Sequence, residues 1–202
     1  VVGEGQILSQ VKAAYISAYS GGYTGTVFNI IFQRAIRVGK VVRTQTSIAD
    51  TPVSVSYTAV NLAEEVLHKP LSEAKVLILG AGTMSELTAT HLQAKGVDTI
   101  FVSNKTFEKA QALAERFNGQ AIRLDDYVEL AKQAYILITS TGAPRYLVGV
   151  EEAQVIAEAH GGQPSVMIDI AVPRDIDPLV ESVPGIHLFN IDALESVVEE
   201  NK

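Results

Sequence analysis

Apolar residues recur at helical spacing through the first seventy positions and predict three amphipathic helices there. The first helix ends at Gly21-Gly22, the second covers about residues 26–43, and the third starts after Pro52 and ends before Pro70. The apolar stripes that we expect to form their cores are Ile7, Val11, Ala14 and Ala18, then Ile31, Ala35, Val38 and Val42, then Val55, Ala59, Leu62 and Val66. Because three helices without a strand enclose little core, we interpret residues 1–70 as an incomplete helical segment.

The pattern changes at Leu71, where short apolar runs begin to alternate with helical stretches. Strands are predicted at 76–79, 99–103, about 121–123, 135–139, 165–170 and 186–189. Alternating strands and helices are typical of an α/β fold with a doubly wound, Rossmann-like parallel sheet in the strand order 3-2-1-4-5-6. The sequence therefore predicts two domains, the helical segment at 1–70 and a Rossmann-like domain at 71–202.

A glycine-rich turn joins the first predicted strand to the helix that follows it. The turn and the start of the helix are formed by Gly80, Ala81, Gly82, Thr83, Met84 and Ser85. Glycines at this junction permit a tight turn and leave room for a pyrophosphate against the N–H groups of the helix N-terminus. Ser85 stands where the third glycine is usual, and a small residue there still allows close packing of helix and strand. The alternative is a strand–helix turn that binds no ligand.

The end of the second predicted strand favours NADP over NAD. An NAD site would carry an acidic residue here to bind the ribose 2′-hydroxyl. The chain instead has Asn104, Lys105 and Thr106, which offer the donors and the positive charge that a 2′-phosphate needs. Alternatively, Lys105 is an ordinary solvated lysine and Thr106 is the N-cap of the next helix.

Two further loops follow predicted strands and are expected at the same edge of the sheet. Thr141 and Gly142 lie in a run of small residues at 140–144, which would let a nicotinamide ring approach the backbone. The second loop covers residues 171–175 and contains Pro173 and Arg174. Turn chemistry alone explains the glycine and prolines equally well.

The composition excludes several kinds of site. The chain has 202 residues, of which 47% are hydrophobic, and no apolar run approaches the ~18 residues of a membrane span. It has no cysteine, which excludes disulfides, thiolate metal sites and a cysteine nucleophile within these residues. The four histidines are scattered without metal-ligand spacing. We therefore expect no metal site and no membrane partner.

The net charge of −7 is unevenly distributed. Residues 1–70 carry six basic and four acidic side chains, a balance of +2, so the rest of the chain carries −9. Any nucleic-acid contact is thus more plausible in the first segment. Arg34, Arg37, Lys40 and Arg43 recur every three residues, so each is rotated by about 60° and the four span half a helix. This spacing favours solvated charges beside a core stripe over a single nucleic-acid-binding face.

Several motifs in the correct order resemble those of the glutamyl-tRNA reductase family, over essentially the whole chain. Residues 3–12 read Gly-Glu-Gly-Gln-Ile-Leu-Ser-Gln-Val-Lys, and residues 32–40 read Phe-Gln-Arg-Ala-Ile-Arg-Val-Gly-Lys. The glycine-rich turn follows, then residues 104–106, which are similar to the family's Asn-Arg-Thr, and residues 169–175, Asp-Ile-Ala-Val-Pro-Arg-Asp. The resemblance implies NADPH-dependent reduction of glutamyl-tRNA to glutamate-1-semialdehyde, a step of tetrapyrrole biosynthesis.

The resemblance also implies roles for residues and partners. In the family a cysteine upstream of the Gly-Glu motif forms a thioester with the glutamyl group, and hydride from NADPH releases the aldehyde. A chain without cysteine is then expected to be a fragment, inactive alone, that joins the end of a catalytic domain to an NADP-binding domain. Glu4, Gly5, Gln6 and Gln10 correspond to substrate-pocket residues. A homodimer formed through a C-terminal domain beyond residue 202 and a cytoplasmic location are expected.

Two alternatives remain open at this stage. One is the cofactor domain of a shikimate-dehydrogenase-like NADP oxidoreductase, which has a similar turn after its second strand. Against it, the motif at residues 3–12 has no counterpart there that we can justify. The other is a non-catalytic module in which the helical segment docks a regulator and the nucleotide fold is a scaffold. Cofactor titration separates this module from both enzymes.

Overall fold

The computed structural model describes residues 5–46 and 55–200, which divide into two compact units between residues 54 and 55. The sequence analysis places the division at residue 70. The difference lies in helix α3 (Val55–Leu67), which packs with the sheet-containing unit. Its Ala59, Val60 and Ala63 are completely or almost completely buried in that unit's core.

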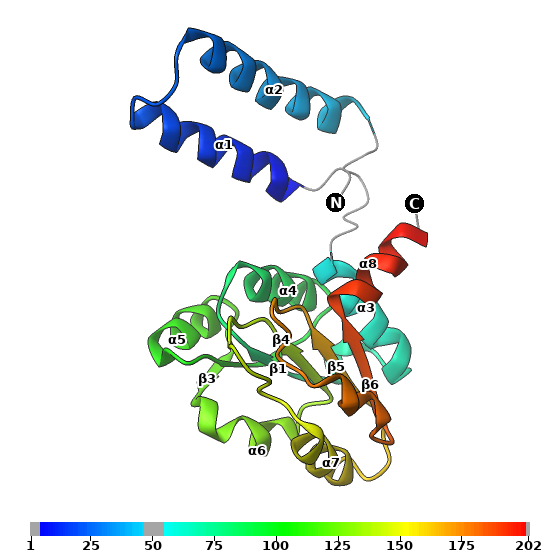
Figure 1. The fold of residues 1–202 in the computed structure, drawn as a ribbon. Coiled ribbons are helices and arrows are strands. Elements are labelled where there is room, and N and C mark those ends of the chain that lie inside the picture. The colour runs from blue at the N-terminus through cyan, green and yellow to red at the C-terminus, as the bar shows by residue number, and fades with distance from the viewer. Residues whose placement is uncertain (1–4, 47–54, 201–202) are drawn as a thin grey trace. The chain divides into compact units, whose positions relative to one another are not determined.

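The first unit is a hairpin of two helices, α1 (Gly5–Ser20) and α2 (Thr26–Gln45) (Figure 1). Both helices were predicted, and the turn between them contains Gly22 at φ +72°. Tyr15 of α1 stacks on Phe32 of α2 with ring centroids 5.7 Å apart. At Gly39 a Cβ atom would lie 2.9 Å from a methyl carbon of Leu8, so this glycine permits the close approach of α1 and α2.

The expected core stripe of α2 is wrong. Ile31, Ala35, Val38 and Val42 are all exposed. The side of α2 that α1 covers instead carries Phe32, Ile36 and Gly39, which are only partly accessible. The second helix has apolar residues on two faces, and the spacing alone does not decide which one packs on α1. Contact with aromatic Tyr15 selects the face that carries Phe32.

The second unit contains a six-stranded parallel sheet (Figure 1). The strands are β1 (Lys75–Leu79), β2 (Thr99–Ser103), β3 (Gln120–Ile122), β4 (Ile136–Thr139), β5 (Ser165–Asp169) and β6 (Ile186–Asn190). Their order, β3-β2-β1-β4-β5-β6, confirms the predicted Rossmann-like topology. The chain reverses its direction across the sheet between β1 and β4, where such folds bind ligands.

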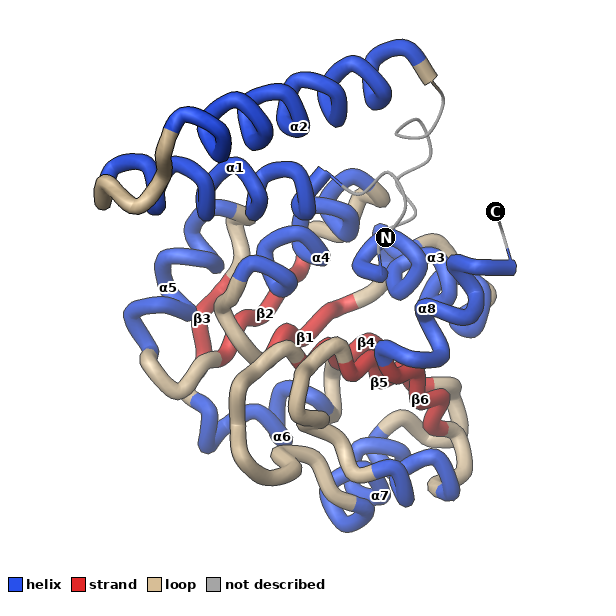
Figure 2. The backbone as a smooth tube through the Cα atoms, turned by 45° about the horizontal axis from the view of Figure 1, so that its top comes forward, coloured by secondary structure: helices blue, strands red, loops and turns tan. Residues whose placement is uncertain are grey.

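Helices cover both faces of the sheet (Figure 2). One face is packed by α3, α4 (Thr83–Ala94), α5 (Phe107–Arg116) and α8 (Ile191–Glu200), and its core contains Ile78, Val102 and Ile138. The other face is packed by α6 (Tyr127–Ala131) and α7 (Val150–Ala159) over Leu77 and Leu137. Short 3-10 turns lie at Leu71–Glu73, Leu124–Asp126 and Pro178–Ser182. Strands buried on both faces explain why their sequences are continuously apolar.

Within the described ranges, no helix is both long enough and apolar enough to cross a membrane. The longest of these helices, α2, is also the one that carries four basic side chains.

Candidate functional site

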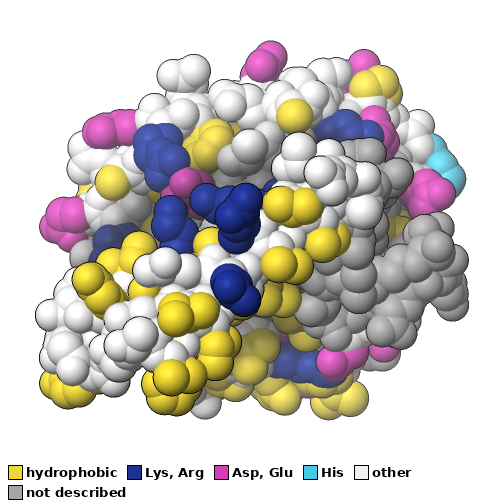
Figure 3. Space-filling view, turned by 90° about the horizontal axis from the view of Figure 1, so that it is seen from above, with side chains coloured by type: hydrophobic (Ala, Val, Ile, Leu, Met, Phe, Trp, Pro, Cys, Tyr) yellow, Lys and Arg dark blue, Asp and Glu magenta, His cyan; other side chains and the backbone are white. Residues whose placement is uncertain are grey.

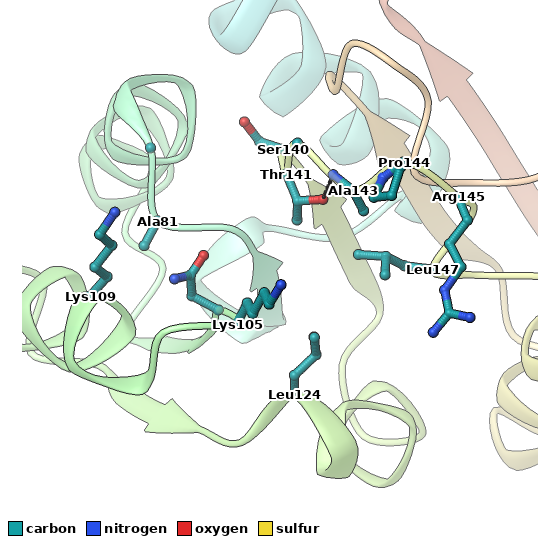
Figure 4. Close-up of a pocket in the computed structure, with 13 residues that line it drawn as sticks. Ala81, Lys105, Lys109, Leu124, Ser140, Thr141, Ala143, Pro144, Arg145 and Leu147 are labelled. Carbon is teal, nitrogen blue, oxygen red and sulfur yellow. Dashed lines mark hydrogen bonds between the residues drawn. The ribbon is translucent and has the colours of Figure 1, made fainter.

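A cleft of about 560 Å³ opens at the carboxyl ends of β1, β2 and β4 (Figure 4). Three loops and their neighbours line it: Ala81 and Gly82; Asn104, Lys105 and Lys109; Ser140, Thr141, Gly142, Ala143, Pro144, Arg145 and Leu147; and Leu124. The structure thus brings together three segments that lie between about 20 and 60 residues apart in the chain. The sequence analysis selected all three as binding loops.

Gly80 makes the turn from β1 into the cleft. Its φ of +114° lies in a region that residues with a Cβ rarely adopt. A Cβ at this position would lie only 2.3 Å from the carbonyl oxygen of Ser140. The Gly80 N–H donates to the Ser103 carbonyl at 2.7 Å. Gly80 therefore fixes the β1 turn against the ends of both neighbouring strands, and it does not itself line the cleft.

Gly82 differs from Gly80 because it borders open space. It is the N-cap of α4, and no side chain caps that helix terminus. A Cβ built at Gly82 would meet no atom within 4 Å. The first N–H groups of α4 therefore have room for an anion beside them, and the helix dipole favours negative charge at this end.

The remaining residues of the glycine-rich turn support the cleft from behind. Ser85 is fully buried within α4, which agrees with a packing role for a small residue at this position. Met84 is half-buried and packs against the core. Thr83 is exposed on the first turn of α4. None of these three side chains lines the cleft.

The loop after β2 places basic side chains in the cleft. Lys105 is exposed and extends toward the space between Ala81 and Leu124 in Figure 4. The Asn104 side-chain amide donates to the Thr106 carbonyl at 3.0 Å, which closes the turn. Thr106 is the N-cap of α5, but its side chain makes no capping hydrogen bond. Lys109 lies in the first turn of α5 and adds a second cation to the lining of the cleft.

The loop after β4 is held by two buried carboxylates. Asp175 accepts hydrogen bonds from the Thr141 N–H at 2.7 Å and from the Thr141 hydroxyl at 2.5 Å. Asp169 in turn accepts from the N–H groups of Asp175 and Ile176, both at 3.0 Å, and from the Thr139 hydroxyl. Burial raises the pKa of Asp175 above its ordinary value, and the Thr141 hydrogen bonds offset only part of this increase. The loop that carries Thr141 and Gly142 is therefore fixed by a network that ends in the core.

Sequence reasoning missed four residues that line the cleft, Lys109, Leu124, Arg145 and Leu147. A signal existed for Lys109, because it lies in the first turn of the helix that follows Asn104, Lys105 and Thr106, close in the chain to the predicted phosphate-binding residues. It also missed the function of Asp175 as the partner of Thr141. That pairing joins positions 34 residues apart and has no local signature.

The predicted substrate residues lie in the first unit. Glu4 is outside the described residues, and Gly5, Gln6 and Gln10 belong to the first turns of α1. Gln10 is exposed. Of the loop at 171–175, Val172 and Pro173 are exposed, and Arg174 forms an ion pair with Asp192 at 2.8 Å. Val172, Pro173 and Arg174 do not line the cleft, and the roles of the four predicted substrate residues stay predictions.

Two family models match the chain in succession. The glutamyl-tRNA reductase N-terminal domain matches residues 1–46, and shikimate / quinate 5-dehydrogenase matches residues 61–197. The gap between the two matches contains the division between the structural units.

Similar proteins cover the whole chain. It is 46% identical over 201 residues to a glutamyl-tRNA reductase of Heliobacterium mobile and 44% identical to one of Bacillus velezensis. These alignments cover 100% of this chain but 45% and 44% of the relatives, so the chain spans about half their length.

Solved structures give the same result. The glutamyl-tRNA reductase of Methanopyrus kandleri is similar with a TM-score of 0.68 and 36% identity, covering 98% of this chain and 50% of that one. The nucleotide binding domain of the Thermoplasma volcanium enzyme shares the fold, with a TM-score of 0.57 and 15% identity over 73% of this chain and 93% of that one. Over its whole length the chain is similar to about half of a glutamyl-tRNA reductase, and through its residues 61–197 it belongs to the shikimate / quinate 5-dehydrogenase family.

Proposed function

We propose that the chain is the cofactor-binding part of an enzyme that reduces glutamyl-tRNA to glutamate-1-semialdehyde with NADPH. The relatives that support this reading are named glutamyl-tRNA reductases, and the similarity extends over all of this chain. Glutamyl-tRNA is then the substrate of the complete enzyme. A homodimer formed outside these residues is part of the same proposal.

The cleft fits a dinucleotide phosphate. Gly82 leaves the N-terminus of α4 open where a side chain would fill the space, and the helix end attracts a pyrophosphate. Ala81 and Thr83 flank this position. A fixed set of backbone N–H groups beside an open glycine is the arrangement that pyrophosphate binding requires. We assign the pyrophosphate to residues 80–85 on this basis.

The charge in the cleft favours a 2′-phosphate. Lys105 and Lys109 both face the cleft, and no acidic side chain lines it. An NAD site would need a carboxylate at the end of β2, where this chain has Asn104. We therefore assign the 2′-phosphate to Asn104, Lys105 and Thr106, with Lys109 as an added cation. The nicotinamide would lie along Thr141 and Gly142, since a Cβ built at Gly142 would meet no atom within 4 Å and the backbone there borders open space.

The residues of the chain contribute binding and orientation to this reaction. The bound nicotinamide supplies the hydride. Asp175 holds Thr141 through two hydrogen bonds, so the wall of the cleft beside the nicotinamide position is preorganised. No thiol is present in the 202 residues, so a thioester step would use a cysteine supplied from elsewhere.

The main structural support for a cofactor site is that Gly82, Lys105 and Thr141 line the same cleft. The shikimate-dehydrogenase-like alternative is supported in fold only, and the match of residues 1–46 to a glutamyl-tRNA reductase domain favours the main proposal. We find no observation that favours a purely non-catalytic docking module.

Cofactor titration with a pair of lysine variants tests the proposal. We expect the chain to bind NADPH more tightly than NADH, and Lys105→Gln to weaken NADPH binding by about 1–3 kcal/mol through loss of a charge-assisted bond. Lys75→Gln is the matched control, because Lys75 is exposed at the opposite, amino end of β1. Fluorescence titration with both cofactors gives the affinities.

Two results would contradict the assignment. Equal affinities of the unmodified chain for NADPH and NADH would remove the 2′-phosphate site. Equal losses in Lys105→Gln and Lys75→Gln would mean that the affinity responds to net charge and not to a lysine in the cleft.

A further inference from the structure

The α1–α2 hairpin is basic without any acidic residue. Between residues 5 and 46 the sequence contains Lys12, Arg34, Arg37, Lys40 and Arg43 and no aspartate or glutamate. No ion pair within the described part of the hairpin can therefore neutralise these cations. The rest of the chain is acidic, since the whole chain carries a net charge of −7. A cationic segment of this kind attracts polyanions.

Three of these cations border one cleft. The cleft between α1 and α2 has a volume of about 340 Å³ and is lined by Lys12, Tyr15, Ile16, Gln33, Ile36, Arg37 and Lys40. Helical spacing on α2 alone does not bring the four cations of that helix to one face. The structure forms a shared basic face by adding Lys12 from α1 to Arg37 and Lys40 from α2.

Polar side chains in the cleft are fixed by hydrogen bonds. The Gln33 amide donates to the Tyr15 hydroxyl at 3.1 Å, and that hydroxyl donates to the Asn29 side-chain oxygen at 3.3 Å. Phe32 stacks on the Tyr15 ring and holds it in place. The surface between the cations thus carries an amide and a hydroxyl, which are groups that bind sugars and phosphates in nucleic acids.

The basic cleft carries more charge than one phosphate group of a nucleic-acid backbone. Lys12, Arg37 and Lys40 supply three cations, whereas each phosphodiester carries a single negative charge. Lysine and arginine side chains are exposed beside hydrophobic side chains on the face of the molecule that Figure 3 shows. Three cations around one cleft suit successive phosphates of one strand better than an isolated anion.

We propose that this cleft, formed by Lys12, Arg37 and Lys40, binds the sugar–phosphate backbone of the tRNA portion of the substrate. The choice of RNA rests on the proposed function, in which the substrate is an aminoacylated tRNA. Arg34 and Arg43 lie on the same helix outside the cleft and contribute charge at longer range. The cleft positions the tRNA, and recognition of the glutamyl group belongs to other residues.

A pair of charge-matched double variants tests this inference in the 202-residue chain. Arg37→Gln/Lys40→Gln removes two cations from the cleft, and Arg34→Gln/Arg43→Gln removes two from the same helix outside it. We expect the cleft variant to bind purified tRNA roughly tenfold more weakly and to lower the slope of log affinity against log salt by about two. The control variant should retain most of the affinity. Fluorescence anisotropy with labelled tRNA at several salt concentrations measures both quantities.

A charge-preserving variant and a cofactor titration complete the design. Arg37→Lys/Lys40→Arg should retain tRNA binding, and circular dichroism should show native helix content in every variant. Equal losses in the two glutamine variants would overturn the inference in favour of a net-charge effect, as would equal binding of heparin and tRNA in competition. The NADPH affinity of each variant separates the two proposals, because a failure of the cofactor site leaves tRNA binding intact and the reverse also holds.

Discussion

At the residue scale, the two glycines of the β1 turn have different functions. Gly80 has a positive φ and leaves no room for a Cβ beside the Ser140 carbonyl, whereas Gly82 borders open space. The same glycine pattern in the sequence thus contains one residue that the fold requires and one that we assign to ligand binding. The sequence alone identifies both glycines, but it does not show which one the backbone conformation requires and which one borders the cleft.

We expect substitutions at the two positions to separate folding from binding. Gly82→Val should give a folded chain that no longer binds NADPH, since its side chain would fill the space proposed for the pyrophosphate. Gly80→Ala should lower the free energy of unfolding by several kcal/mol, because of its φ and its contact with backbone. Thermal denaturation and NADPH titration of both variants measure these effects. A folded Gly82→Val variant with unchanged affinity would contradict the assignment.

Asp175 is the second residue with a defined prediction. Asp175→Asn keeps the shape but replaces one accepting oxygen by an NH₂ group, which faces a donor of Thr141. We expect a loss of stability of roughly 1–3 kcal/mol and weaker NADPH binding through a loosened Thr141 loop. Asp177→Asn is a control at an exposed turn, where the side chain accepts only from Leu179 N–H. Urea denaturation and cofactor titration of both variants provide the comparison, and equal behaviour would exclude a specific role for Asp175.

At the element scale, a stack of three side chains joins segments from different parts of the second unit. Lys69 follows α3, and Tyr135 directly precedes β4. The Lys69 ammonium lies 3.7 Å from the centre of the Tyr135 ring. His160, at the end of α7, stacks on the same ring with centroids 4.6 Å apart. Burial lowers the pKa of His160 below its ordinary value of 6.5, and the nearby charge of Lys69 acts in the same direction.

This stack predicts a pH dependence of stability. Because the folded pKa of His160 is lowered, the unfolded state binds more protons between the folded pKa and 6.5. The contribution of His160 is therefore fully present above pH 6.5 and decreases as the pH falls through that interval. His160→Phe keeps a ring on Tyr135 but cannot be protonated, so its unfolding free energy should fall less between pH 7 and pH 5. Urea titrations at several pH values test this, and identical pH profiles would refute it.

The elements themselves were largely predictable. Residues 76–79 of β1 are fully buried on both faces of the sheet, and their continuous apolar sequence identifies the strand without further information. The packing side of α2 was not predictable, because apolar residues lie on two of its faces and contact with Tyr15 decides between them. The basic cleft was missed for a related reason. It uses Lys12 from α1, and helical spacing within α2 contains no information about another helix.

At the scale of the whole molecule, the chain combines a proposed cofactor site with no thiol. We expect the purified 202-residue chain to bind NADPH but to form no glutamate-1-semialdehyde from glutamyl-tRNA. A colorimetric assay of the aldehyde after incubation with both substrates tests this, with a complete glutamyl-tRNA reductase as the positive control. Aldehyde formed by the chain itself would show that another residue replaces the cysteine of the proposed mechanism.

The one-sided charge of the α1–α2 hairpin has a consequence for handling the protein. Residues 5–46 carry five basic and no acidic side chains, so a peptide cut from this region would bind a cation exchanger at neutral pH. The acidic remainder would bind an anion exchanger under the same conditions. The intact chain therefore carries one segment that favours a cation exchanger and one that favours an anion exchanger, and its isoelectric point of about 5.1 describes neither segment.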